Sequence, residues 1–240
     1  MVVTALLILV VPPVSGYVSL PAYAFSHWTA YFTVMIDAVA LIFPLLITLI
    51  TQPRLLDEWS NSYALATRQR VEPARYFGAR VAASAILAAV VFLVLTIVCF
   101  AVARWTYSYP SPEGPPGVLV ETRYQFSQLW AVSPALYLVV YCLWVALVSG
   151  TVAAVCTLIT AVVGNKFVAL AAPFVLWSLT DFGLAVLDLA ALSLPPFRFH
   201  IKQQPIWTEF AGWALILIVL GALYLYVHRR DYQTAGIVRT

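Results

Sequence analysis

Charged residues are scarce in this chain of 240 residues, making up only 10% of it, whereas hydrophobic residues make up 63%. A soluble domain usually carries about 25% charged residues. No charged residue occurs at positions 1–36, 38–53, 81–103 or 124–165. Because roughly 20 apolar residues in a helix cross the hydrocarbon of a bilayer, these runs exclude an ordinary water-soluble fold and predict an integral membrane protein.

The sequence also lacks the usual marks of catalysis and cofactor binding. Its cysteines, Cys99, Cys142 and Cys156, lie far apart inside apolar runs, which fits neither a disulfide framework nor a metal site. No phosphate loop of the form G-x-x-x-x-G-K-[ST] is present, so the chain is not expected to hydrolyse ATP itself. A net charge of +3 favours no nucleic-acid partner. We therefore predict no catalytic residue, no metal and no bound cofactor.

The apolar runs predict an all-α protein with six transmembrane helices in a single domain over residues 1–240. The runs are continuously apolar rather than alternating, which favours helices over a membrane barrel. The first run has no basic region before it, so we interpret it as a retained span rather than a signal peptide. The expected spans are 2–24, 28–50, 76–103, 129–163, 166–192 and 207–227. The fourth is either one tilted helix or a short interfacial piece before a helix starting near Pro134.

Basic residues predict the orientation. Six spans place both termini on one side, and basic residues concentrate in the segment 51–80 and in the tail after 227. Fewer lie in the loops expected on the other side, where Arg104, Arg123, Arg198 and Lys202 occur. The positive-inside rule then places both termini and the segment 51–75 in the cytoplasm. We expect the chain to lie in the cell membrane of a bacterium.

The segment between the second and third spans is patterned. Apolar residues fall at helical spacing along one face, at Leu55, Leu56, Trp59, Tyr63 and Ala66. Asp57, Glu58, Ser60 and Asn61 lie off that face. The pattern predicts a short amphipathic helix at the membrane surface. Two interpretations remain open: a helix lying among lipid headgroups, or a helix that docks a soluble partner.

A second pattern runs through the same segment: an acid, a pair of small residues, a Thr-Arg pair, and then an aromatic and a basic residue entering the third span. These residues are Glu58, Asn61-Ser62, Thr67-Arg68, Tyr76 and Arg80. In this respect the segment resembles the first cytoplasmic loop of ABC-2 type transporter permeases. It departs from that pattern at Ser62, where the family often has glycine, and at Gln69-Arg70, where a proline often follows. The amphipathic helix that usually precedes the first span of those permeases is also absent.

The resemblance implies that this loop forms a coupling helix held in a cleft of a separate ATPase subunit, which would bind ATP and Mg. The expected docking residues are Leu55, Leu56, Asp57, Glu58, Trp59, Asn61, Ser62, Tyr63, Thr67 and Arg68. It further implies a second permease chain, identical or similar, and an exporter, for which we expect an amphiphilic or hydrophobic substrate. The alternatives are an intramembrane enzyme that uses buried acids, and a membrane assembly or scaffold protein.

Three acids fall inside expected spans: Asp37 in the second, and Asp181 and Asp188 in the fifth. A charged residue at the centre of a membrane helix costs about 2.5–3.5 kcal/mol on insertion scales, so such acids are usually turned inward or paired. They are candidates for substrate contact or proton transfer, or for a structural clamp between helices. Gly150 with Ala154 forms a pair of small residues one turn apart, which lets helices approach closely.

Overall fold

The computed structural model describes most of the chain as helices. The described residues are 2–19, 28–60, 73–106, 132–163, 166–189 and 206–237, together with Phe126 and Leu129. Within them the fold is all-helical, with seven helices. They are α1 (Val2–Ser19), α2 (Trp28–Thr51), α3 (Pro53–Ser60), α5 (Pro73–Thr106), α7 (Pro134–Val162), α8 (Lys166–Val186) and α9 (Ile206–Ile237).

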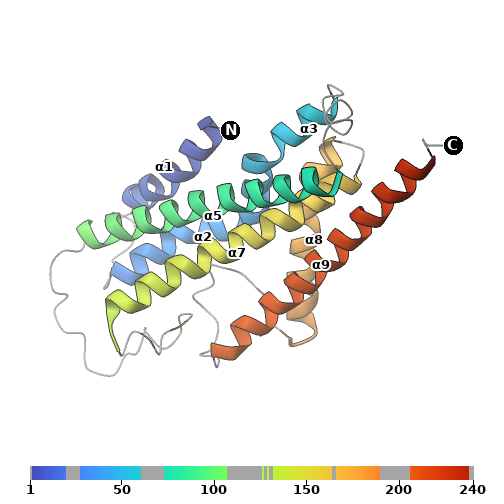
Figure 1. Ribbon diagram of the computed structural model, residues 1–240. Coiled ribbons are helices and arrows are strands. Elements are labelled where there is room, and N and C mark those ends of the chain that lie inside the picture. Colours follow the sequence, from blue (N-terminus) through green and yellow to red (C-terminus); the bar gives the residue numbers. More distant parts are fainter. Residues whose placement is uncertain are drawn as a thin grey trace.

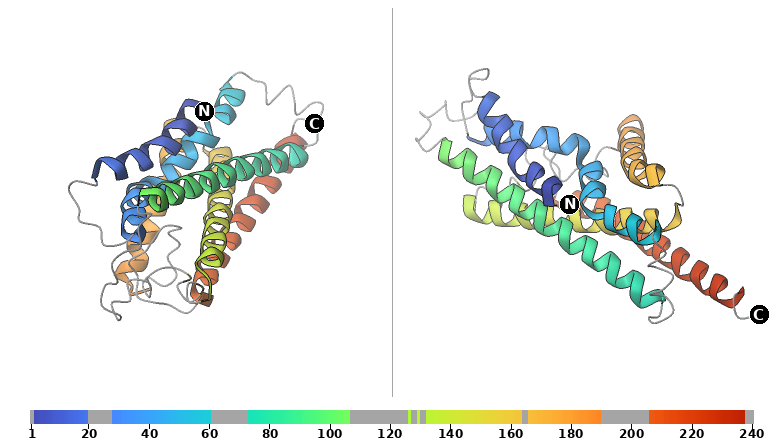
Figure 2. Two further views of the ribbon diagram at one scale, coloured as in Figure 1. Left: turned by 90° about the vertical axis from the view of Figure 1, so that its left-hand side faces the viewer. Right: turned by 90° about the horizontal axis from the view of Figure 1, so that it is seen from above.

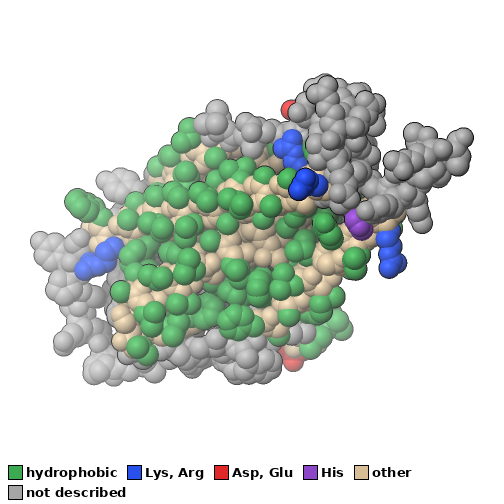
Figure 3. Space-filling model, viewed as in Figure 1, with side chains coloured by type: hydrophobic (Ala, Val, Ile, Leu, Met, Phe, Trp, Pro, Cys, Tyr) green, Lys and Arg blue, Asp and Glu red, His purple; other side chains and the backbone are tan. Residues whose placement is uncertain are grey.

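Four helices are long and apolar enough to cross a membrane: α5, α7, α8 and α9. Shorter apolar stretches lie in α1 over Thr4–Val14 and in α2 over Ile42–Thr51. Figure 3 shows hydrophobic side chains across the middle of one face of the molecule, with the visible Lys and Arg side chains towards its two ends. The chain is therefore an integral, multi-pass membrane protein.

The observed helices differ from the expected spans mainly at their ends. α2 matches the expected span to within a residue, and α5 begins at Pro73, a residue suited to a first helical turn. α7 begins at Pro134 after the extended residue Ser133, which agrees with the alternative of a later start. α9 continues to Ile237, ten residues beyond the expected end, because backbone hydrogen bonding does not stop where hydrophobicity does.

The helix in the fifth expected span, 166–192, ends earlier than expected. α8 stops at Val186, and Asp188 adopts a left-handed backbone conformation with φ of 57°. The Leu189 N–H donates to the Leu184 carbonyl at 2.8 Å, and the Asp188 N–H donates to the Ala185 carbonyl at 3.3 Å. This pair of bonds is a Schellman motif, which satisfies carbonyls left over at the end of a helix.

Three helices form the centre of the bundle. α5 and α7 make the most extensive contact, and α2 packs against both of them. α1 lies against α2 and α5, α9 runs along α7, and α8 touches α2 and α7 (Figure 1). In Figure 1, α8 runs steeply across the direction of α2 and α5. The end of α2, the start of α5 and the end of α9 lie towards the same end of the bundle, where α3 is also found (Figures 1 and 2).

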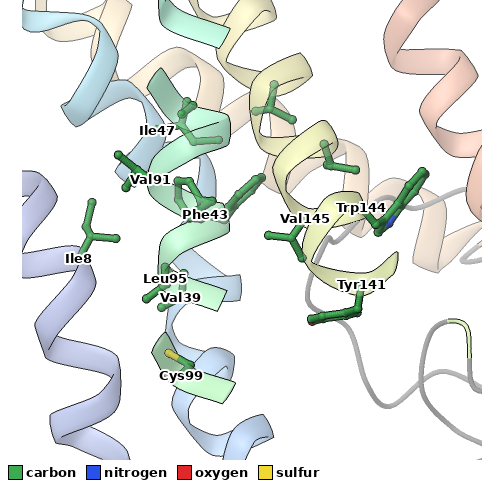
Figure 4. Close-up of a cluster of buried hydrophobic side chains, with 14 of the residues drawn as sticks. Ile8, Val39, Phe43, Ile47, Val91, Leu95, Cys99, Tyr141, Trp144 and Val145 are labelled. Carbon is green, nitrogen blue, oxygen red and sulfur yellow. The ribbon is translucent and has the colours of Figure 1, made fainter. Parts of the chain in front are cut away.

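The core lies between α2, α5 and α7. Figure 4 shows its apolar side chains converging from these helices, with Ile8 of α1 at the edge. Phe43 is fully buried, and its ring meets the rings of Phe92 at 5.0 Å and Trp177 at 6.0 Å between centroids, both edge to face. Such pairs contribute roughly 0.5–1.5 kcal/mol beyond their buried area. Phe43 therefore ties α2 to both α5 and α8.

Candidate functional site

The helix α3 is joined to α2 through one residue, Gln52. The Gln52 N–H donates to the Thr48 carbonyl at 2.9 Å, which continues the hydrogen bonding of α2, and its own carbonyl accepts from the Leu56 N–H at 3.0 Å, which starts α3. Pro53 interrupts the series because it has no N–H to donate. α2 and α3 thus meet at a bend with no intervening loop, so a displacement of α3 acts directly on α2.

The described side chains of α3 show a sharp division between buried and exposed. Leu55 and Leu56 are buried, at 4% and 7% exposed, whereas Asp57 is exposed. The amphipathic pattern predicted from the sequence is confirmed at these three positions. Since both leucines are buried within this chain, they anchor the helix, and Asp57 is the described side chain that α3 presents outward.

A buried set of hydroxyl and amide groups surrounds the α2–α3 bend. The Gln52 amide nitrogen Nε2 donates to Thr51 Oγ1 at 2.8 Å and to Thr157 Oγ1 of α7 at 3.2 Å. Thr157 Oγ1 in turn lies 2.7 Å from Ser84 Oγ of α5. We call Gln52, Thr51, Ser84 and Thr157 the junction network. It connects the bend to the two most closely packed helices of the bundle.

A cavity of about 90 Å³ opens beside the junction network, lined by residues that include Leu55 and Arg80. Gln52 Oε1 is buried and accepts no hydrogen bond from the described residues. Leaving a buried acceptor unsatisfied costs about 1–3 kcal/mol. The cavity has room for a water molecule, which needs roughly 10–15 Å³. The bend is therefore polar and loosely filled, in contrast to the packed core beside it.

Two residues of the resemblance, Tyr76 and Arg80, lie at the start of α5 near this cavity. Tyr76 is buried and its ring lies 5.6 Å from that of Phe77. The Arg80 guanidinium carbon lies 5.7 Å from the centre of the Tyr76 ring, which is within cation–π range. The aromatic and the basic residue are thus one structural unit, which places a positive charge at the wall of the junction cavity.

Other predicted site residues lie partly or wholly outside the described structure. Glu58 and Trp59 belong to the backbone of α3, but their side chains lie outside the described residues. The same holds for the side chain of Asp37 in α2. Entirely outside the described residues are Asn61, Ser62, Tyr63, Thr67 and Arg68.

The two acids of the fifth expected span have different surroundings. Asp181 is half-buried within α8 and lines a cavity between α7, α8 and α9. Asp188 is exposed and lies beyond the end of α8, where its left-handed backbone forms the helix cap. Seven residues apart, they share no site. Among the described residues, no three His, Cys, Asp or Glu side chains gather in a way that could hold a metal ion.

Gln52, Ser84 and Thr157 were missed by the sequence reasoning. The Ser84 and Thr157 hydroxyls also lie within hydrogen-bond distance of a carbonyl of their own helix, as hydroxyls in apolar helices commonly do, so neither stands out in the sequence. Gln52 offers a faint signal, an amide directly before a proline at the end of an apolar run. Their meeting depends on how α2, α5 and α7 pack.

No protein-family model matches the chain, and no curated protein or solved structure shows significant similarity to it.

Proposed function

We propose that this chain is the membrane-spanning permease subunit of an ATP-binding cassette transporter, an exporter of an amphiphilic or hydrophobic substrate. ATP, with Mg, is hydrolysed by a separate subunit that docks on α3 and the residues following it. The chain itself is no enzyme. A second permease chain, identical or similar, pairs with it in the cell membrane, with both termini in the cytoplasm.

The observation that carries the proposal is the attachment of α3. An amphipathic helix at one end of the bundle is anchored by Leu55 and Leu56, exposes Asp57, and joins α2 without a loop. A helix lying passively in headgroups would not require so direct a connection. The sequence resemblance over Asp57 to Arg80 supports the same function, because it begins on α3 and ends on the Tyr76–Arg80 pair.

The mechanism follows from that connection. When ATP draws two ATPase subunits together, each pulls its coupling helix, and α3 passes the displacement to α2 at Gln52. The junction network then carries it to Ser84 of α5 and Thr157 of α7. The two helix bundles rock about their shared interface, which alternates access to the pathway. ATP shifts this equilibrium only by its different affinity for the two states.

The intramembrane enzyme is the weaker alternative, since it requires acids that converge at one site. The acids in question are Asp37, expected toward the outer half of the second span, and Asp181, expected near the middle of the fifth, so we do not expect them to meet at one depth.

The test is purification of the tagged chain from its native membranes in mild detergent. We expect a soluble ATP-hydrolysing subunit to co-purify in a stoichiometric amount, and Asp57→Lys to reduce its recovery because the substitution reverses the exposed charge of α3. Asp188→Lys is the matched control, as Asp188 is also an exposed aspartate but lies beyond α8.

Three results would contradict the proposal: no ATPase in the purified sample, equal recovery with both variants, or equal loss with both. Thermal unfolding of each variant in the same detergent separates loss of docking from loss of folding.

A further inference from the structure

A second cavity, of about 240 Å³, lies between α7, α8 and α9. Both α8 and α9 pack on α7, but among the described residues they make no extensive contact with each other, and Figure 2 shows them standing apart. α7 therefore forms the floor of a groove, and the other two helices form its walls. Val155 and Ile159 lie on the floor, Leu176 and Trp177 on one wall, and Ile216 on the other. We call this cavity the lateral groove.

The surface of the lateral groove is almost entirely apolar. Thr180 lines it, but the Thr180 hydroxyl donates to the Leu176 carbonyl of its own helix at 2.7 Å. Asp181 is the only acid among the lining residues, and it already interacts with another group of the chain. No basic residue is among them. An occupant therefore has no unmet charge to neutralise, and uncharged hydrocarbon suits the groove because burying a polar group without a partner is costly.

The lateral groove opens onto the outer surface of the bundle. Leu176, Leu215 and Val219 line it and are about half exposed. They belong to α8 and α9, whose apolar spans are the least buried of the four long helices. In a bilayer such a surface faces hydrocarbon, so lipid tails surround the mouth of the groove as its solvent.

The size of the lateral groove limits what can enter it. Pockets for drug-sized ligands usually measure roughly 300–1,000 Å³, and the groove is smaller than that. A helix of a second chain, about 10–12 Å wide with its side chains, would have to stay outside. A single flexible chain fits, and it restores the dispersion contacts that an empty groove would leave its wall without.

We propose that the lateral groove binds the hydrocarbon tail of a membrane lipid, which enters sideways from the bilayer and lies on α7 between α8 and α9. Because lipid tails are as apolar as the groove itself, close packing drives the binding, and transfer out of water does not. The site therefore selects a tail and ignores the headgroup. It requires neither ATP nor a partner subunit, so it is independent of the permease function proposed above.

The test is photochemical crosslinking of the full-length chain in nanodiscs of phosphatidylcholine that carries a diazirine in the middle of one tail. Mass spectrometry locates the adducts. Val155 and Ile159, which are partly exposed, report on the floor of the groove. Leu179 of α8 is the internal standard for ordinary lipid contact: it is 63% exposed, does not line the groove, and lies within one turn of Leu176, which does. We expect the floor residues to be labelled with a yield similar to that of Leu179.

A variant that fills the groove should displace the tail. Ile216→Phe places a larger side chain on the α9 wall. We expect the yield on the two floor residues, relative to Leu179, to fall roughly five-fold, the lower end of what overpacking a filled site costs. Ile218→Phe is the matched control, because it makes the same change on the same helix at a side chain that is 67% exposed and does not line the groove. It should leave the ratio unchanged.

Labelling of Leu179 without labelling of the floor residues in the native chain would overturn the proposal without any variant, so it stays testable even if Ile216→Phe fails to fold. That result would mean that packing, or a side chain of a second copy, closes the groove. An equal fall in both variants would also overturn the proposal.

A second measurement uses phosphatidylglycerol with the same photoreactive tail. Because the groove selects the tail, the ratio of floor to standard labelling should match that found with phosphatidylcholine. A ratio that depends on the headgroup would assign the binding to the headgroup and contradict the proposal. None of these results bears on the ATPase partner, whose absence would contradict only the permease function.

Discussion

In α7, 56% of the apolar span is buried within the chain, whereas in α8 and in α9 only 11% is buried. The sequences of these helices are similarly apolar, so hydrophobicity does not decide which of them form the centre. In lipid, helices associate through close packing and interhelical hydrogen bonds. α7 has both of these against α5. α8 and α9 each take part in one interhelical hydrogen bond as well, from Thr48 Oγ1 to the Leu170 carbonyl and from Trp213 Nε1 to Thr151 Oγ1, but they present large apolar side chains outward, towards lipid.

The contrast between the buried helix α7 and the exposed helix α9 is tested most directly by substituting one glycine in each of them. A Cβ at Gly150 of α7 would lie 3.1 Å from the Ala85 carbonyl oxygen of α5, and backbone there cannot easily move aside. We expect Gly150→Ala to destabilise the chain by about 1–3 kcal/mol, the usual cost of overpacking. The measurement is thermal or denaturant unfolding in detergent.

Gly221→Ala in α9 is the matched control, because no atom lies within 4 Å of the added Cβ. Alanine favours a helix over glycine by up to about 1 kcal/mol, so this variant should be as stable as the native chain or more so. If both variants lose the same stability, the difference between the inner and outer helices is not one of packing. Gly150 itself faces Ala85 and Ala89 of α5 within this chain.

The next largest effect concerns hydrogen bonds. Thr157→Val keeps the shape of the side chain but removes the oxygen that receives the Gln52 amide and faces Ser84. We expect a loss of about 1 kcal/mol, in line with hydrogen bonds measured between membrane helices. Thr180→Val in α8 removes a hydroxyl that bonds only its own helix among the described contacts, and should change stability by less than about 0.5 kcal/mol.

A double-mutant cycle with Gln52→Leu tests whether Thr157 acts through the bend. Coupled residues give a non-additive term of roughly 0.5 kcal/mol or more. Additive effects of the two substitutions would show that the junction network does not join α2 to α7 energetically, and would remove a step from the proposed mechanism.

The sequence predicted the positions of the helices well, because a long uncharged run can cross a membrane in few conformations other than a helix. It predicted their ends less well. The end of α8 depends on the left-handed backbone at Asp188, a feature that hydrophobicity does not register, and α9 remains helical past its apolar part. The apolar face at Leu55 and Leu56 was predictable from spacing alone.

The polar residues around the α2–α3 bend could not be predicted from the sequence. Gln52, Ser84 and Thr157 come from three helices and are separated by up to 105 positions, so only the packing of α2, α5 and α7 brings them together. Likewise, Asp181 was a candidate from its place in an apolar run, but no pattern of residues indicated that α7 and α9 would complete a cavity beside it.

The most direct test of the account is the accessibility of α3 from each side of the membrane. Cys99, Cys142 and Cys156 are buried, so Asp57→Cys introduces a thiol that is selectively reactive among the described positions. The account predicts that a membrane-impermeant maleimide labels this thiol in inside-out vesicles but not in intact cells, and that a bound ATPase subunit protects it. Labelling in intact cells would place α3 on the outer surface and contradict the coupling role.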